Sequence, residues 1–277
     1  MNNSFNFNRF GLLVKRQWLE FGKIYLISLL VVVGVLILFY AWNLPEPEAE
    51  KGYRYNSEGF LYLSFRIPLF LTLGFIFISV IASGYFSLLG QKPKAIIELM
   101  TPASTLEKWL CSIFYTGIFS VFSFLLVFYI TDLAFVKYID KTIGTITFSW
   151  TSGVHPTPKT GIVSARSFFN DFFEHDEIKS MVVVPFMITS IFLLGSVYFN
   201  RFHYIKTAVV VMLFLTALIY TLIQTANWMT RDKMQDSANF GFSSAHNEFF
   251  IYAMVGITAV TVFLWCVTFF RVKEKEV

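Results

Sequence analysis

The sequence predicts an all-α membrane protein with six transmembrane helices in a single domain, residues 1–277. Hydrophobic residues make up 56% of the chain and the mean hydropathy is +0.61. Six apolar runs contain no Asp, Glu, Lys, Arg or His, and each is long enough, at about 1.5 Å per residue, to cross about 30 Å of hydrocarbon. The runs are residues 24–42, 67–89, 109–131, 180–199, 207–224 and 249–270.

The distribution of basic residues predicts which side of the membrane each loop faces. Six spans put both termini on one side, and Lys and Arg concentrate in cytoplasmic segments near span ends. With a cytoplasmic N-terminus, the inner segments hold 12 of the 22 basic residues, and the remainder are spread over longer outer loops at 43–66, 132–179 and 225–248. The net charge of +4 follows from this topology and requires no nucleic-acid partner.

The N-terminal segment has the pattern of an amphipathic helix over residues 5–22. Apolar residues recur at steps of three and four, while the basic residues lie off that stripe. We expect this helix to lie in the inner headgroup region, and the alternative is a helix packed on another subunit. The stripe consists of Phe7, Phe10, Val14, Trp18 and Phe21.

The loop between the second and third spans predicts a short cytosolic helix. Pro93 suits the first turn of a helix and Pro102 cannot continue one, so about two helical turns fit between them. Ser104 and Glu107 then have the spacing of a capping box, which would start the third span. Such a helix could transmit a push from outside the membrane, and the alternative is a rigid turn without a further role.

The long outer loop at 132–179 carries two local patterns. Ile146, Phe148 and Trp150 alternate with polar residues, as in a strand. A second set of aromatic residues forms one face of a short helix, which either rests on the outer leaflet or caps a cavity, and we favour the leaflet. This set is Phe168, Phe169, Phe172 and Phe173.

Residues for enzymatic or ion-driven chemistry are not arranged in any recognisable motif. The four histidines are scattered, and the acidic residues around His175 are more typical of a solvated helix end than of a metal site. The sequence contains no phosphate-binding Gly-x-x-x-x-Gly-Lys-Ser/Thr loop. Ionisable groups at membrane depth usually mark proton or ion pathways, so uncharged spans argue against an ion-coupled carrier. We therefore predict no catalytic residues, no metal site and no cofactor bound by this chain.

The topology and one inner segment resemble a known family. Residues 100–108, Met-Thr-Pro-Ala-Ser-Thr-Leu-Glu-Lys, are similar to a Leu-Pro-Ala-Ser-x-x-Glu-Lys segment of type-2 ATP-binding-cassette (ABC) exporter permeases, in particular the six-span permeases of Bacteroidota. In that family the loop between spans two and three carries a coupling helix that docks on an ATPase subunit. The long loop between spans three and four departs from the commoner family pattern.

This resemblance implies a function and a set of partners. The chain would be the permease subunit of an exporter in the bacterial inner membrane, paired with a second permease copy or paralogue, and ATP and Mg²⁺ would be held by the ATPase subunit. No residue selects a substrate, and the alternative function is a non-transporting scaffold or accessory subunit. The implied docking residues are Lys92, Pro93, Lys94, Glu98, Pro102, Ser104, Glu107 and Lys108.

Overall fold

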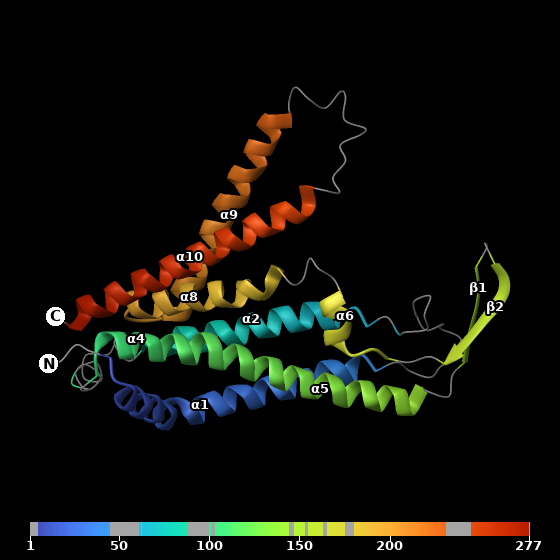
Figure 1. Cartoon of the computed structure of the whole chain (residues 1–277), viewed down its shortest axis with the longest axis horizontal. Coiled ribbons are helices and arrows are strands. Elements are labelled where there is room, and N and C mark those ends of the chain that lie inside the picture. The colour runs from blue at the N-terminus through green and yellow to red at the C-terminus, as the bar shows by residue number, and fades with distance from the viewer. Residues whose placement is uncertain are drawn as a thin grey trace. The chain divides into compact units, whose positions relative to one another are not determined.

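The computed structural model is built from long apolar helices (Figure 1). Among the residues that the structure describes, five helices are long and apolar enough to cross a membrane, so the chain is a multi-pass membrane protein by helix length and hydropathy. They are Phe7–Trp42, Arg66–Tyr85, Thr105–Lys141, His203–Thr225 and Ile251–Lys275. The structure describes residues 5–44, 61, 63–87, 100, 103–143, 147–152, 155–162, 165–174, 180–230 and 245–276.

The sixth predicted span, at 180–199, contains a helix too short to meet the same length criterion. A 3-10 turn, η3 (Ser180–Val183), leads into α8 (Val184–Tyr198), which has 15 residues. Pro185 lies in the first turn of α8, where its missing N–H costs nothing, and Phe199 is extended and ends the helix. The predicted count of six spans therefore stays a prediction.

The boundaries of three other helices differ from the sequence prediction. The N-terminal amphipathic helix and the first span form one helix, α1 (Phe7–Trp42), without a turn between them. The second span is α2 (Arg66–Tyr85). The third span begins as α4 (Thr105–Ile113), passes through a π-helix, η2 (Phe114–Phe119), and continues as α5 (Ser120–Ile143), well beyond the predicted end at residue 131.

The chain divides into two compact units. Unit 1 comprises Met1–Arg16, Ile78–Ile118 and Ser180–Val277, and unit 2 comprises Gln17–Phe77 and Phe119–Lys179. The chain passes from one unit to the other within α1, within α2, within η2 and between Lys179 and Ser180. Each unit is described by itself below.

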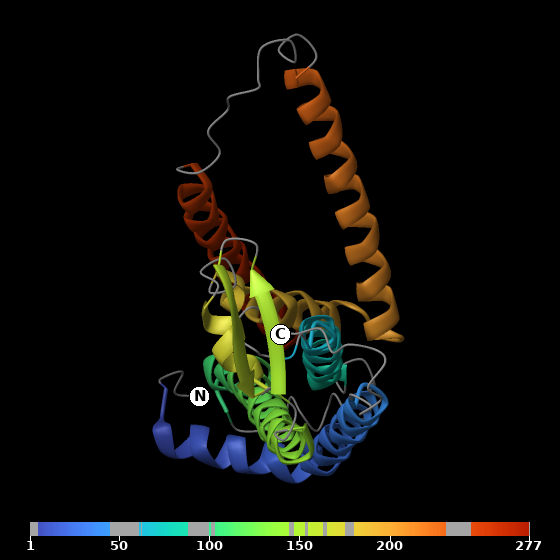
Figure 2. The same cartoon turned by 90° about the vertical axis from the view of Figure 1, so that its right-hand side faces the viewer.

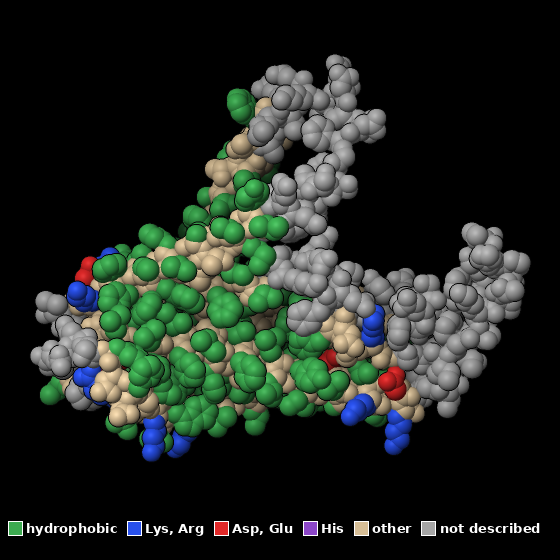
Figure 3. All heavy atoms as spheres, viewed as in Figure 1, with side chains coloured by type: hydrophobic (Ala, Val, Ile, Leu, Met, Phe, Trp, Pro, Cys, Tyr) green, Lys and Arg blue, Asp and Glu red, His purple; other side chains and the backbone are tan. Residues whose placement is uncertain are grey.

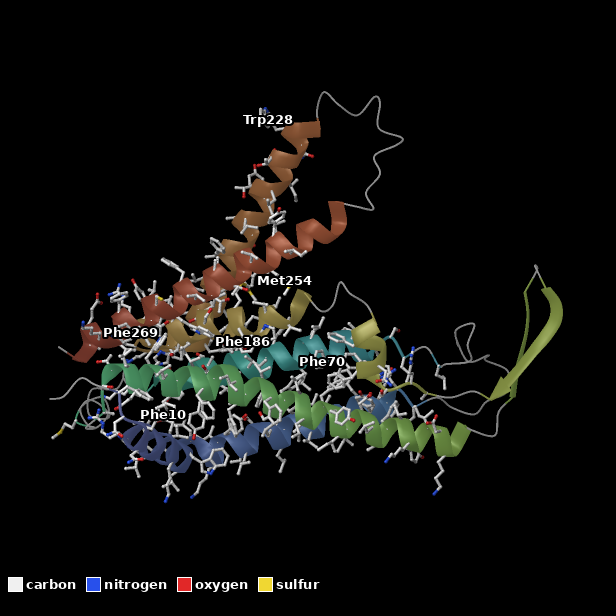
Figure 4. The ribbon with its side chains drawn as sticks, in the orientation of Figure 1. Phe10, Phe70, Phe186, Trp228, Met254 and Phe269 are labelled. Atoms are coloured by element: carbon white, nitrogen blue, oxygen red, sulfur yellow. The ribbon has the colours of Figure 1, made fainter. Side chains whose placement is uncertain are left out.

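In unit 1, α8 packs against α9 (His203–Thr230) and α10 (Ala245–Glu276). The core here includes Leu193, Val197 and Val272. α8 and α9 approach so closely at Gly195 that a Cβ atom there would lie 2.0 Å from the Thr207 hydroxyl oxygen. Small residues permit such helix contacts in membranes. Away from this crossing α9 diverges from α10, and Trp228 near its far end is exposed (Figures 1 and 4).

Unit 2 has an aromatic core formed by α1, α2, α5 and the short helix α6 (Phe168–Glu174). Phe128 is fully buried and contacts the rings of Tyr40, Phe70 and Phe168. A hairpin of β1 (Thr147–Ser152) and β2 (His155–Ile162) pairs antiparallel, as Figure 2 shows, which confirms a strand in the region of the predicted alternation.

The surface has the character expected of a protein solvated by lipid. Figure 3 shows apolar side chains over most of the visible helical surface, whereas Lys, Arg, Asp and Glu lie toward the helix ends. In α9 nearly every described side chain is exposed, although the sequence is strongly apolar. A soluble protein would bury such a helix, so the exposure supports the membrane assignment.

The close crossing of α8 and α9 predicts a strong effect of one methyl group. Gly195→Ala places Cβ against Thr207 and should destabilise the protein by about 1–3 kcal/mol through overpacking. The measurement is the melting temperature of the purified protein in detergent. Gly256→Ala is the matched control, because a Cβ at Gly256 meets nothing within 4 Å. Equal melting temperatures for the two variants would contradict the packing at this crossing.

Candidate functional site

The site in unit 1 is built on the first turn of α4. Ser104 is extended (φ −72°, ψ 153°) and its hydroxyl accepts a hydrogen bond from the backbone N–H of Glu107 (3.3 Å). In return, Oε2 of Glu107 accepts from the backbone N–H of Ser104 (2.9 Å). This arrangement confirms the predicted capping box, which satisfies two N–H groups that have no partner inside the helix.

The second oxygen of Glu107 joins α4 to the start of α1. Oε1 accepts from the backbone N–H of Asn6 (2.9 Å) and lies 3.1 Å from Nη2 of Arg9. The Glu107 side chain is 0% exposed, so its charge depends on these partners in place of water. The carboxylate is thus a buried joint between two segments that are about one hundred residues apart in sequence.

Two further hydrogen bonds hold the helix that follows. The Tyr115 hydroxyl in η2 donates to the backbone carbonyl of Val14 in α1 (2.7 Å). The Trp109 indole N–H donates to the carbonyl of Trp265 in α10 (2.9 Å), and the Trp109 ring packs edge-on against Phe269. The start of the third span is therefore fixed to both the N-terminal segment and α10.

The structure describes only part of the predicted docking segment. Ser104 and Glu107 lie together with Asn6 and Arg9. Lys108, the next residue in the sequence, is buried as well. Sequence reasoning assigned Arg9 only to the polar face of a helix and did not single out Asn6. The remaining predicted docking residues lie outside the described residues: Lys92, Pro93, Lys94, Glu98 and Pro102.

The predicted interfacial stripe is mixed in exposure. Phe7 is 81% exposed and Trp18 is also exposed, which fits contact with lipid. The residues of this part of α1 that the protein buries are instead Leu13 and Gln17, on an adjacent face, and Gly22. The other three stripe residues, Phe10, Val14 and Phe21, are partly buried. The stripe therefore borders a protein-packed face, and no bend separates it from the span.

A second charged cluster, in unit 2, was not anticipated from the sequence. Arg66 at the start of α2 lies 3.1 Å from Asp132 in α5, and the two side chains are 3% and 1% exposed. Oδ1 of Asp132 also accepts from the Tyr40 hydroxyl (2.9 Å). The only signal was position, because Arg66 and Asp132 directly flank the predicted spans 67–89 and 109–131. The sequence pattern places both residues in outer loops, but α5 continues through Asp132.

The same cluster holds α6 against the helices. Oδ2 of Asp132 accepts from the backbone N–H of Phe168 (2.7 Å), and Arg66 donates to the carbonyl of Arg166 (2.9 Å). The rings of Phe168 and Phe172 are buried and both contact Phe70, which Figure 4 labels between α2 and α6. The favoured expectation that this aromatic face rests on the outer leaflet is wrong for these two residues, because unit 2 itself covers them.

The buried polar side chains of the described residues hold chain segments together and do not form a recognisable catalytic arrangement. Within the described ranges no group of three or more His, Cys, Asp or Glu residues is placed to hold a metal ion. Each buried carboxylate instead collects donors from several segments, which is an arrangement that fixes geometry. No family model, curated protein or solved structure matches this chain.

Replacing the carboxylate of Glu107 with an amide should weaken the joint. Both carboxylate oxygens accept backbone N–H groups, and in Glu107→Gln the amide NH₂ would face one of these donors. We expect a loss of about 1–3 kcal/mol of stability, from one unsatisfied buried donor and the lost partner of Arg9. Thermal unfolding in detergent measures this loss, with Glu20→Gln at an exposed position of α1 as the control. A variant as stable as the control would contradict the joint.

The Arg66–Asp132 pair predicts a partial rescue by a second substitution. Asp132→Asn removes the carboxylate that lies 3.1 Å from the buried Arg66 guanidinium, at a cost of about 3–5 kcal/mol. Adding Arg66→Gln removes that charge and should recover part of the stability. Asp140→Asn is the control on the same helix, because Asp140 is exposed and accepts one backbone N–H, from Ala165 (2.9 Å). If the stability loss of the double variant equals the sum of the losses of the two single variants, the pair is not coupled.

Proposed function

We propose that this chain is the transmembrane permease subunit of an ABC exporter, which moves an unidentified substrate by alternating access while a separate ATPase subunit supplies the energy. The observation that carries this proposal is the buried Glu107 joint, because it ties the entry of α4 to the start of α1. A push on the segment ahead of α4 would reach both helices together.

The contacts around the joint support transmission of force. A displacement spreads along groups that are bonded to one another. Here Glu107 is bonded to the start of α1, while Trp109 and Tyr115 bond α4 and η2 to α10 and α1. The proposed docking residues, Lys92 to Lys108, lead directly into this bonded region. An ATPase subunit that held them would act on three membrane helices.

The π-helix η2 supplies a place where the third span could bend. π-segments inside α-helices disturb the regular hydrogen-bond ladder and often occur at functional sites. η2 lies between α4, which carries Glu107, and α5, which carries Asp132. In the proposed cycle α4 tilts at η2 while Asp132 keeps the far part of the helix attached to α1 and α2.

The unit 2 cluster supports an external source of energy. A proton or ion relay needs a carboxylate that exchanges its partners. Both oxygens of Asp132 are already engaged, by Tyr40, Arg66 and the Phe168 N–H, which is an anchoring arrangement. In the proposal the energy comes instead from ATP and Mg²⁺ bound by the partner ATPase. A second permease copy or paralogue completes the exporter. The proposal places both termini in the cytoplasm of a bacterial cell.

A scaffold function is the second candidate, and one observation favours it. Asp132 and Asp140 each accept a backbone N–H from the segment around α6, so part of the predicted outer loop is firmly held. A loop segment with a fixed conformation could form a binding surface for partner proteins. In that case the outer segment, and not the inner one, would carry the activity.

Affinity purification, with recovery of an ATPase subunit and its ATP hydrolysis as the measured quantities, tests the permease proposal. A tagged full-length chain, purified from its native membrane, should bring down an ATPase identified by mass spectrometry as carrying a P-loop. Lys94→Ala with Glu98→Ala should reduce recovery of that subunit at least about tenfold and abolish stimulated ATP hydrolysis, since both side chains are proposed docking contacts. Lys137→Ala with Asp140→Ala, on α5, is the control with the same change in charge.

The outcomes separate the two candidates. Recovery of the ATPase by the control and not by the docking variant supports the permease. Absence of any P-loop ATPase from the purified material contradicts it. If the docking variant behaves as wild type and deletion of residues 144–164 removes the bound partners, the chain is a scaffold.

A further inference from the structure

An open groove lies in unit 1 where α2 meets the turn between α8 and α9. It has a volume of about 440 Å³ and is lined on one side by Ser83 and Gly84 of α2 and by Ser87, just beyond the end of that helix. The other side is formed by residues 202–205, Phe-His-Tyr-Ile. The groove therefore has apolar walls with a few polar groups, which is the composition of a site for an amphiphilic molecule.

The turn beside the groove displays an aromatic side chain. Phe202 has a φ of 55°, a backbone conformation that costs a non-glycine residue about 1–2 kcal/mol. Its ring is 71% exposed. Tyr198, near the end of α8, is exposed as well. Exposed aromatic residues at the end of apolar helices are typical of the level of the lipid headgroups.

Basic side chains surround the same turn. Nζ of Lys275 donates to the Val197 carbonyl (2.6 Å), and the Arg271 guanidinium lies 5.4 Å from the centre of the Tyr198 ring. Nζ of Lys206 lies 5.8 Å from the centre of the Phe199 ring. Arg201, in the turn itself, is also basic and exposed. We call Arg201, Lys206, Arg271 and Lys275 the basic collar.

The collar has little counter-charge within the described side chains. Glu274 is the acidic side chain described at this end of α10, and it pairs with Arg271 (2.7 Å). His203 adds a further polar atom, because its Nδ1 is buried without a hydrogen-bond partner among the described residues. The backbone of Phe199 interacts with the His203 ring, and the positive charges of Lys275 and Lys206 also act on it. An anion at this place would gain several partners at once.

We propose that this end of unit 1 binds an anionic phospholipid, with the phosphate at the basic collar and His203 and an acyl chain in the groove. The positive collar selects the charge of the headgroup, and the apolar walls beside it select a molecule that carries a hydrocarbon chain. Neither a soluble anion nor a neutral lipid matches both features. This site stands independently of the permease proposal, since it uses no docking residue and no ATPase.

Lipid titration of the full-length protein tests the charge part of the proposal. Native mass spectrometry in detergent compares phosphatidylglycerol with phosphatidylcholine of the same acyl chains, and the charged lipid should bind several-fold more tightly. Arg201→Gln with Lys206→Gln, both exposed at the turn, should weaken phosphatidylglycerol binding by about fivefold for each charge removed. Lys137→Gln with Lys141→Gln, exposed on α5, is the matched control and should bind as wild type.

A second variant tests the groove. A Cβ at Gly84 meets nothing within 4 Å, so Gly84→Leu should fill the groove without disturbing the surrounding packing. It should reduce binding of both lipids, whereas Gly256→Leu, at an equally open position of α10, should reduce neither.

Three results would overturn the proposal. The first is equal affinity for the two lipids. The second is a Gly84→Leu variant that binds like Gly256→Leu. The third is competition by millimolar inorganic phosphate or glycerol phosphate, because displacement by a soluble anion would assign the collar to free phosphate and not to lipid.

Discussion

Burial of two carboxylates near the ends of the third span organises the rest of the structure. A charged group without water needs several partners, and it finds them in whichever segments lie nearby. Glu107 takes donors from Asn6, Arg9 and Ser104, whereas Asp132 takes them from Tyr40, Arg66 and Phe168. Each carboxylate thus determines which helices are held together in its own unit. Removing either one would leave several chain segments without their common partner.

Local features were predictable from the sequence, and long-range pairings were not. The capping box depends on residues three positions apart, so Ser104 and Glu107 sufficed to predict it. The partners Arg9 and Asn6 are about one hundred residues away, and a single sequence contains no signal for that contact. Arg66 and Asp132 were recognised only as residues flanking two spans. The polarity of a flanking residue does not reveal whether a helix continues through it, as α5 does.

Helix boundaries show the same limit. The change from amphipathic to fully apolar sequence near Lys23 separates the predicted interfacial helix (5–22) from the predicted first span (24–42), but polarity alters the surroundings of a helix and not its backbone hydrogen bonds. Between residues 7 and 42 there is no proline, so the helix continues. In the fourth apolar run, Pro185 and the extended Phe199 confine α8 to 15 residues. Apolar length therefore predicted the membrane class correctly, whereas the number of spans depends on these backbone details.

Most hydroxyl groups of the described apolar helices bond to their own backbone, which leaves apolar contacts to hold the middle of each span. Thr116 donates to Ser112, Thr189 to Phe186 and Thr216 to Met212, each within one helix. Such bonds satisfy the hydroxyl without linking two helices. Many of the side-chain bonds between helices lie around Glu107, Trp109 and Tyr115 in unit 1 and around Asp132 in unit 2. Single bonds of this kind also join Tyr25 to Ser123, Ser79 to Tyr204 and Lys275 to the Val197 carbonyl. Apolar surfaces slide past one another more readily than bonded groups separate, so any rearrangement should preserve the bonded cluster of each unit and shift the apolar helix contacts within that unit.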